Sequence, residues 1–447
     1  YIIYIYKMNQ YENNTFTTKQ WLQFFFVGLF PWVAVNSVFA ELAVFNRYMP
    51  EGKELSSQAG LACQIANISL IYVYLRSIFQ DRFITIEKTV YILLFLTIIS
   101  CLTLSFLWQI TIGGHSIIIL ACTFSGGIVG ILSIVTLYPW ASNFQQPKAI
   151  SALSTGTAAS SLIGSLLGLI QGAGETTQRF SPFVYMFILS LLAIISAYCF
   201  YSLNNNNNND INNKFKMDND NDDDEGEKMK MYSTNNDVEK NNNNNSKKNT
   251  SLLTINTNDD AKATLLIPNN NINNISKSLN WKRLIVYILM PVIVQFFNCS
   301  LNYALLPGIV PYLICGHQLT FWFTLLISFS NVFGRFISTF CQHNRMANLL
   351  PFLIFLMIFL FTLAFILASS TPSIKRIGLI EILAGIGVAL FAGLNGYIES
   401  LVFLVPSRIL KDENDQTKEL GLQIVGVIGQ VGAFIGTAAT AGLVTES

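Results

Sequence analysis

The fold is decided by residues 30–42, FPWVAVNSVFAEL, in which a proline, an amide and a carboxylate interrupt a long apolar run. Asn36 and Glu41 are expensive inside a membrane-spanning helix unless they face protein or water. Pro31 removes a backbone hydrogen-bond donor, and that loss needs local repair. The stretch therefore predicts a spanning helix that carries part of a polar site.

The composition of the whole chain is that of a polytopic membrane protein. Hydrophobic residues make up 52% of its 447 residues and charged residues only 12%, whereas soluble domains carry about 25% charged residues. The net charge of +1 gives no reason to expect a nucleic-acid partner. The seven scattered cysteines show neither metal-ligand spacing nor a disulfide framework. Met8 is a plausible start of translation, and we expect no cleavable signal peptide.

About eleven apolar segments have the roughly 20 residues that a spanning helix needs. They are 21–45, 57–79, 88–108, 115–139, 150–171, 182–203, 283–304, 318–341, 349–369, 376–404 and 420–444. Between the sixth and the seventh, residues 204–280 combine runs of asparagine with an acidic block and almost no aromatic residues. Such a segment cannot bury enough surface to fold, so we expect it to be disordered. The predicted fold is all-α, with two bundles of six and five helices.

Lysine and arginine gather in the loops on one side of these segments, which marks that side as cytoplasmic. This predicts a cytoplasmic N-terminal segment, 1–20, and a six-helix bundle, 21–203. A cytoplasmic linker, 204–280, then leads to a five-helix bundle, 281–447, with the C-terminus outside.

Polar residues inside the predicted spans recur at helical spacing and are mostly neutral. Gln64 and Asn67 share one face of the second span, and amides of the seventh span do the same. Several stripes of this kind predict a shared cavity. A single Asn or Gln, in contrast, can serve simply to join two helices by a hydrogen bond. Arg335 is expected either to extend toward the membrane surface or to pair with an acid such as Glu399. The seventh-span stripe consists of Gln295, Asn298 and Asn302.

Neutral donors and acceptors favour a neutral substrate that is polyhydroxylated or heteroaromatic, because amides bond both hydroxyls and ring imides. Trp32 or Tyr303 could stack on a flat ring. An enzyme is not expected, because no nucleophile with a base and no metal cluster is visible. A carrier for nucleosides or another heterocycle, and a receptor that does not transport, stay open as alternatives.

Several motifs, ordered along nearly all of the hydrophobic sequence, resemble those of the eukaryotic riboflavin transporter family. They are Trp32–Asn36 with Glu41-Leu42, Pro50–Gly52, Gln64–Ile68, Leu169–Gly174, Asn302 with Leu306-Pro307, Ser330-Asn331, Tyr397, and Gly429–Gly432 with Gly436. The chain departs from the family pattern at Ala43, where proline is usual, and at Ser69-Leu70, where Gly-Pro is common. A basic residue common in the tenth span is also missing, and Glu399 lies near its place.

The resemblance implies a plasma-membrane carrier with eleven spans that moves riboflavin without sodium. It also implies an alternating-access fold similar to those of the major facilitator and equilibrative nucleoside carriers, with riboflavin as substrate and no cofactor. The oligomeric state is left open. The implied substrate residues are Trp32, Asn36, Gln64, Asn67, Gln171, Asn302 and Asn331.

Helix arithmetic separates Glu41 from the first two of these residues. Trp32 and Asn36 lie one turn apart and about 40° around the helix axis, whereas Glu41 lies nearly opposite Trp32. Glu41 is therefore expected to pair with a neighbouring helix or to gate the outer mouth. Arg335 and Glu399 share the expected role of gating or helix pairing. Glu51, in a short outer loop, is expected to be a turn or helix-cap acid.

Overall fold

The computed structural model describes residues 16–52, 54–79, 85–144, 146–172, 178–206, 281–304, 317–340, 346–369, 378–411, 413 and 415–445. Nearly all of them belong to one compact unit, Tyr1–Asn205 with Val286–Ser447. The predicted linker, 204–280, lies outside the described residues except for its first three, as do residues 1–15 of the predicted N-terminal segment.

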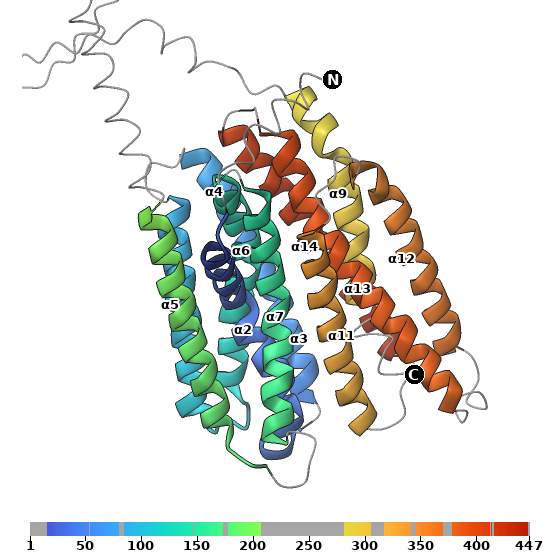
Figure 1. The fold of residues 1–447 in the computed structure, drawn as a ribbon. Helices are drawn as coiled ribbons and strands as arrows, with labels where there is room; N and C mark the ends of the chain where they lie inside the picture. The colour runs from blue at the N-terminus through green and yellow to red at the C-terminus, as the bar shows by residue number, and fades with distance from the viewer. Residues whose placement is uncertain are drawn as a thin grey trace, which may run out of the picture. The chain divides into compact units, whose positions relative to one another are not determined.

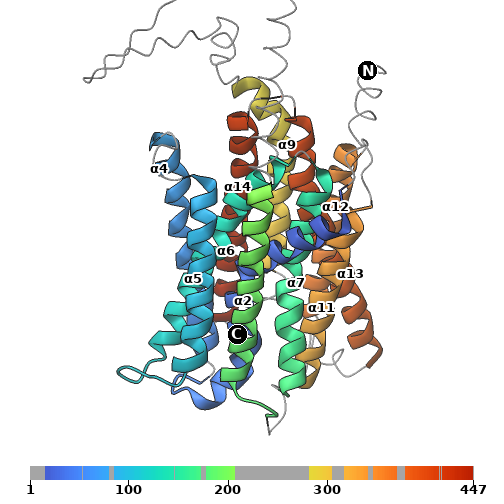
Figure 2. The ribbon, with the colours of Figure 1, turned by 60° about the vertical axis from the view of Figure 1, so that its left-hand side comes forward.

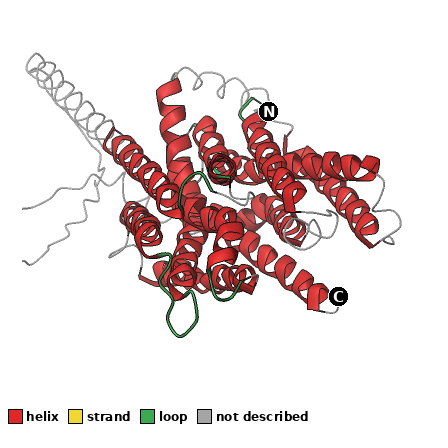
Figure 3. Ribbon diagram, turned by 90° about the horizontal axis from the view of Figure 1, so that it is seen from below, coloured by secondary structure: helices red, strands yellow, loops and turns green. Residues whose placement is uncertain are grey.

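The described residues are helical, apart from turns, loops and an isolated bridge between Ile112 and His115 (Figure 3). The N-terminal half contains α2 (Thr18–Tyr48), α3 (Glu54–Ile65), η1 (Ala66–Leu70), α4 (Ile71–Phe79), α5 (Ile86–Leu107), α6 (Ile117–Ser142), α7 (Pro147–Gln171) and the helix Pro182–Asn206. The C-terminal half contains α9 (Trp281–Ala304), α11 (His317–Ser338), α12 (Met346–Ser369), α13 (Gly378–Ile409) and α14 (Asp415–Thr445). In Figure 1 the N-terminal half is blue to green and the C-terminal half is yellow to red.

Within the described ranges, eight helices are long and apolar enough to cross a membrane. Two shorter apolar helices, Phe323–Ser338 and Leu349–Leu363, coincide with the predicted eighth and ninth spans. The predicted second span is broken into α3, the 3₁₀ segment η1 and α4. The all-α membrane fold is therefore confirmed, and the count of eleven spans stays a prediction.

The first span begins at a well-defined helix start. The side chain of Thr17 accepts a hydrogen bond from the backbone N–H of Gln20, and the side chain of Gln20 accepts one from the N–H of Thr17. This capping box satisfies two donors that the first helical turn would otherwise leave unpaired. The helix then continues through Pro31 to Tyr48.

Both halves contain helix pairs in unusually close contact, and glycine makes that contact possible. A Cβ atom at Gly156 of α7 would lie 2.0 Å from the carbonyl oxygen of Phe25 in α2. In the other half, a Cβ at Gly334 of α11 would lie 1.9 Å from the carbonyl oxygen of Gly393 in α13. Only glycine lets these backbones approach so closely, as is common between membrane helices.

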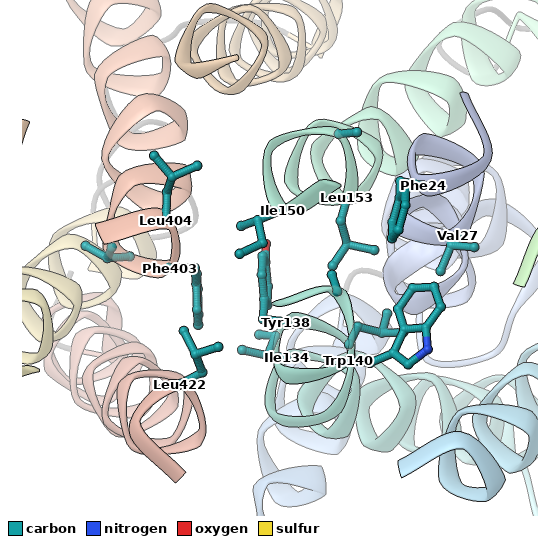
Figure 4. Packing of buried hydrophobic residues seen from close by; sticks show 14 of the residues in the cluster. Phe24, Val27, Ile134, Tyr138, Trp140, Ile150, Leu153, Phe403, Leu404 and Leu422 are labelled. Carbon is teal, nitrogen blue, oxygen red and sulfur yellow. The ribbon is translucent and has the colours of Figure 1, made fainter. Parts of the chain in front are cut away.

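Aromatic and aliphatic side chains join the two halves. The ring of Tyr138 in α6 stacks on Phe403 in α13, with centroids 3.9 Å apart and an interplanar angle of 5° (Figure 4). Ile134 and Leu422 belong to the same buried cluster and lie beside this stack in Figure 4. The halves therefore share one hydrophobic core at this level.

Candidate functional site

The break in the second span carries two of the predicted substrate residues. The Nδ2 of Asn67, in η1, donates to the backbone oxygen of Gln64 at 3.0 Å and to its Oε1 at 3.1 Å. The Nε2 of Gln64 donates to Thr437 Oγ1 of α14 at 3.3 Å, which joins the two halves. The Oδ1 of Asn67 is buried and has no hydrogen-bond partner among the described residues. Asn67 therefore presents an unpaired acceptor at an interruption of a membrane helix.

Trp32 and Asn36 lie one turn apart on α2, and both are partly exposed. The indole ring lies flat against Gly130 of α6, where a Cβ atom would meet three ring atoms at 2.9–3.0 Å. The Nδ2 of Asn36 donates to Ser160 Oγ of α7 at 2.8 Å. Neighbouring helices therefore hold both side chains, as binding residues require.

The stripe on α9 consists of buried or partly buried amides with unpaired polar atoms. Asn298 is completely buried, and neither its Nδ2 nor its Oδ1 has a hydrogen-bond partner in the part of the chain that the structure describes. The same is true of Asn302 Oδ1 and Gln295 Oε1. Periodicity predicted the stripe, but only Asn302 was expected to bind substrate. Gln295 and Asn298 become candidate binding residues because their buried amide atoms lack hydrogen-bond partners among the described residues. Only the packed structure reveals this.

Asn331 is held by the charged centre of the C-terminal half. Its Oδ1 accepts from Arg335 Nε at 3.1 Å, and its Nδ2 donates to Ala392 O at 3.3 Å. The guanidinium pairs with Glu399 at 2.5 Å, and the Arg335 side chain is only 7% exposed. Arg335 therefore forms an ion pair and does not extend to the membrane surface. Its Nη1 also donates to the backbone oxygen and Oγ of Ser154 in α7, at 3.2 and 3.3 Å.

Further hydroxyl contacts across the halves lie beside this arginine. Ser154 Oγ lies 2.8 Å from Ser400 Oγ, and Ser151 Oγ lies 3.1 Å from Ser338 Oγ and 2.6 Å from Thr339 Oγ1. These residues come from the start of α7 and the final turns of α11 and α13, so they lie at the same end of the helices. We call the group formed by Arg335, Glu399, Ser154, Ser400, Ser151 and Ser338 the polar latch.

Glu41 and Gln171 lie together in the N-terminal half. Both side chains are fully buried, and Gln171 lies within interaction range of the Glu41 carboxyl group. Tyr185 is a further neighbour of Glu41, and its hydroxyl donates to Gly164 O at 2.9 Å. Because these neighbours all belong to one half, their arrangement favours helix pairing as the role of Glu41. It places Gln171 beside Glu41, at the end of α7.

Glu51 caps a helix from a distant loop, as expected. It accepts hydrogen bonds from the backbone N–H and the Oγ of Ser116, the residue at the N-terminus of α6. Burial alone would raise the pKa of Glu51, but these hydrogen bonds and nearby His115 outweigh it and lower the pKa below its ordinary value of 4.5.

The described side chains offer hydrogen bonds rather than metal chemistry. In the ranges given above, no group of three His, Cys, Asp or Glu side chains could hold a metal ion. Amides on α3, η1, α9 and α11, with an indole on α2, can bind a flat solute that has both donors and acceptors.

Comparison with known proteins identifies the family. The family model for solute carrier family 52, riboflavin transporter, matches residues 17–446. The chain belongs to this family. Its match to the giant panda (Ailuropoda melanoleuca) protein, solute carrier family 52, riboflavin transporter, member 3, is 32% identical over 154 residues, which is 34% of this chain and 33% of that protein. Riboflavin transporter rft-1 of Caenorhabditis elegans is 33% identical over 153 residues, 33% of this chain and 35% of the worm protein. These alignments therefore span about a third of the relatives' length.

A solved structure shows which fold the family member adopts. The proton:xylose symporter XylE, of the major facilitator superfamily, superimposes with a TM-score of 0.54 at 11% identity, covering 96% of this chain and 89% of XylE. The fold is thus of the major facilitator type. That likeness concerns the fold alone.

Proposed function

We propose that this chain carries riboflavin across the plasma membrane by sodium-independent, facilitative alternating access. The observation that carries the proposal is membership of the riboflavin transporter family over residues 17–446. The transporter fold and the neutral polar side chains support it, because riboflavin combines a flat ring bearing an imide with a chain of hydroxyl groups. Nothing in this mechanism calls for a cofactor or a covalent step.

The substrate site that we propose draws on both halves. Trp32, Asn36, Gln64, Asn67 and Gln171 come from the N-terminal half, and Asn302 and Asn331 from the C-terminal half. Trp32 would stack on the ring, and the amides would bond its imide and the hydroxyls. The hydrogen bond from Gln64 to Thr437 supports this arrangement, because it brings α3 and α14 together at the level of the broken helix.

The polar latch is proposed to close the cytoplasmic end of the carrier. By the charge distribution of the loops, the end at which α7 begins and α11 ends faces the cytoplasm. Contacts of Arg335 with Ser154 and of Ser151 with Ser338 hold the halves together there. The structure would then correspond to a state closed toward the cytoplasm, and Glu41 would pair helices inside the N-terminal half.

The direct test is uptake of labelled riboflavin in a riboflavin auxotroph that expresses the chain. We expect saturable uptake that unlabelled riboflavin inhibits and unlabelled uridine does not, with no change when choline replaces sodium. Surface expression without saturable uptake would refute the proposal, and inhibition by uridine would favour a nucleoside carrier.

The proposed site is tested by Asn36→Ala and Asn67→Ala. Each removes a hydrogen-bonding group worth on the order of 1–3 kcal/mol when its partner is left unpaired. We expect lower riboflavin uptake at a normal surface level. Asn46→Ala is the matched control, because Asn46 also lies on α2 and bonds a neighbouring helix, through Ser56 Oγ at 3.2 Å. Unchanged kinetics in both site variants would remove these residues from the site.

A further inference from the structure

The amide of Asn298 on α9 is a polar group that no contact described so far uses. The residue is completely buried, and both its donor and its acceptor lack partners there. An unpaired polar group of this kind typically costs about 1–3 kcal/mol, and native structures contain few of them. A leucine would pack at this position without that cost. The amide therefore has a use other than filling space.

Helix packing does not account for it. Where α9 meets α14, a Cβ atom at Gly432 would lie 2.4 Å from Phe296 O, and one at Gly436 would lie 2.2 Å from Ser300 O. Ser300 Oγ donates to Gly432 O at 3.0 Å. Figures 1 and 2 show the two helices side by side. Backbone contacts, Ser300 and the packing of Gln295 on Gly429 thus join α9 to α14, and Asn298 makes no hydrogen bond to any described residue at this junction.

The neighbouring positions of α9 border the proposed substrate site. Cys299 lies near both charges of the Arg335–Glu399 pair. Tyr303 lies near the same pair and also near Cys63 of α3, the residue before Gln64. Asn298 and Asn302 are one turn apart and share a face of the helix. Asn302 is partly exposed, whereas Asn298 is enclosed one turn away.

We infer that Asn298 and Asn302 recognise the imide edge of the isoalloxazine ring, an inference that rests on the riboflavin transport proposed above. A carboxamide presents a donor and an acceptor side by side, and an imide presents a carbonyl oxygen beside an N–H. The two groups therefore form a pair of parallel hydrogen bonds, with the ring N3–H donating to Oδ1 and the ring carbonyl accepting from Nδ2. The isoalloxazine ring contacts Asn302 first. Asn298 then forms hydrogen bonds with the ring when the carrier closes around the substrate.

The test compares riboflavin with 3-methylriboflavin, in which a methyl group replaces the imide hydrogen. Binding of both ligands is measured on the purified full-length chain for the wild type, Asn298→Ala, Asn302→Ala and the control Ser300→Ala. We expect the wild type and the control to bind the methylated ligand at least about tenfold more weakly. At least one asparagine variant should bind riboflavin more weakly by a similar factor and lose the preference between the ligands.

The ratio between the two ligands is independent of how much of each variant folds. A wild type that binds riboflavin, with the same preference kept in both asparagine variants, would overturn the inference and leave the proposed function standing. Lower thermal stability with an unchanged ratio would equally overturn it, because the amides would then be structural. A wild type that binds no riboflavin would refute the proposed function, and the inference with it.

Discussion

Replacing Glu399 by glutamine tests whether the polar latch holds one end of the carrier closed. The substitution keeps the shape of the side chain but removes the charge that lies 2.5 Å from Arg335. Arg335 keeps its bonds to Asn331 and Ser154 but loses its charged acceptor. A hydrogen bond to a charged group contributes about 1.5–3 kcal/mol. Since the two side chains are 7% and 18% exposed, solvent screens the interaction little.

This free energy is shared between global stability and the equilibrium between closed and open forms. Arg335 and Glu399 both belong to the C-terminal half, so their pair acts on the closed form through the contact of Arg335 with Ser154. With all of this free energy acting on the closed form, the open population would rise about 10- to 150-fold, because about 1.4 kcal/mol corresponds to a factor of ten. A larger open population exposes residues that the latch now covers. Ser338 is one of them, since it is fully buried against Ser151.

The assay is maleimide labelling of Ser338→Cys in detergent, measured above the labelling of the parent chain. We expect Glu399→Gln to increase the labelling rate by about tenfold or more. The control is Ser407→Ala, on the same helix, whose hydroxyl donates only locally to Leu404 O at 2.8 Å. The reference is the Ser338→Cys chain that keeps Glu399. A labelling rate within a factor of two of this reference would refute the gating argument and leave the ion pair as a helix-pairing contact.

Three further predictions concern other parts of the chain. Gly130→Ala should raise KM for riboflavin about three- to tenfold, because the new methyl group displaces the indole of Trp32. Gly60→Ala is the control and should leave KM unchanged, because a Cβ at Gly60 meets open space. Equal KM values for the two variants would exclude Trp32 from the site. Glu51→Gln should lower thermal stability at pH 7 by about 1 kcal/mol. Because the pKa of Glu51 lies below its ordinary 4.5, the deficit should shrink as the pH falls through that lowered pKa, and a deficit independent of pH would contradict this. Deleting residues 210–270 should leave riboflavin uptake unchanged at equal surface expression, and a loss of uptake would show that the linker takes part in transport.

Much of the fold could be read from the sequence because a bilayer restricts the choices. Backbone groups in lipid must bond within their own helix, so long apolar runs predict helices. All eight long apolar helices found in the described ranges coincide with predicted segments. The break at η1 could not be predicted in the same way. Its hydropathy continues across Ala66–Leu70, and the contact at the break is tertiary, because a Cβ at Gly127 of α6 would lie 2.8 Å from Ala66 Cβ.

The candidate site divides along a similar line. Periodicity placed Gln64 with Asn67 on one face, and the structure adds a hydrogen bond between them. Periodicity left two positions open for the Arg335 side chain, at the membrane surface or beside an acid. Only the packing of α11 against α13 selected the ion pair with Glu399. Gln171 illustrates the limit, because its neighbour Glu41 lies 130 positions earlier in the chain. No local pattern specifies such a pairing.

The sequence by itself determined that this protein is a bundle of membrane helices with neutral polar stripes, because hydropathy and helical periodicity are local properties. Tertiary structure alone decided which polar groups find partners. Arg335 reaches Ser154 across 181 positions of sequence, whereas Asn298 finds no hydrogen bond among the described residues. A hydrogen bond needs its two atoms within about 3 Å. Only the packing of helices that are distant in sequence sets that distance. The tertiary structure therefore distinguishes a residue of the polar latch from a candidate ligand-binding residue.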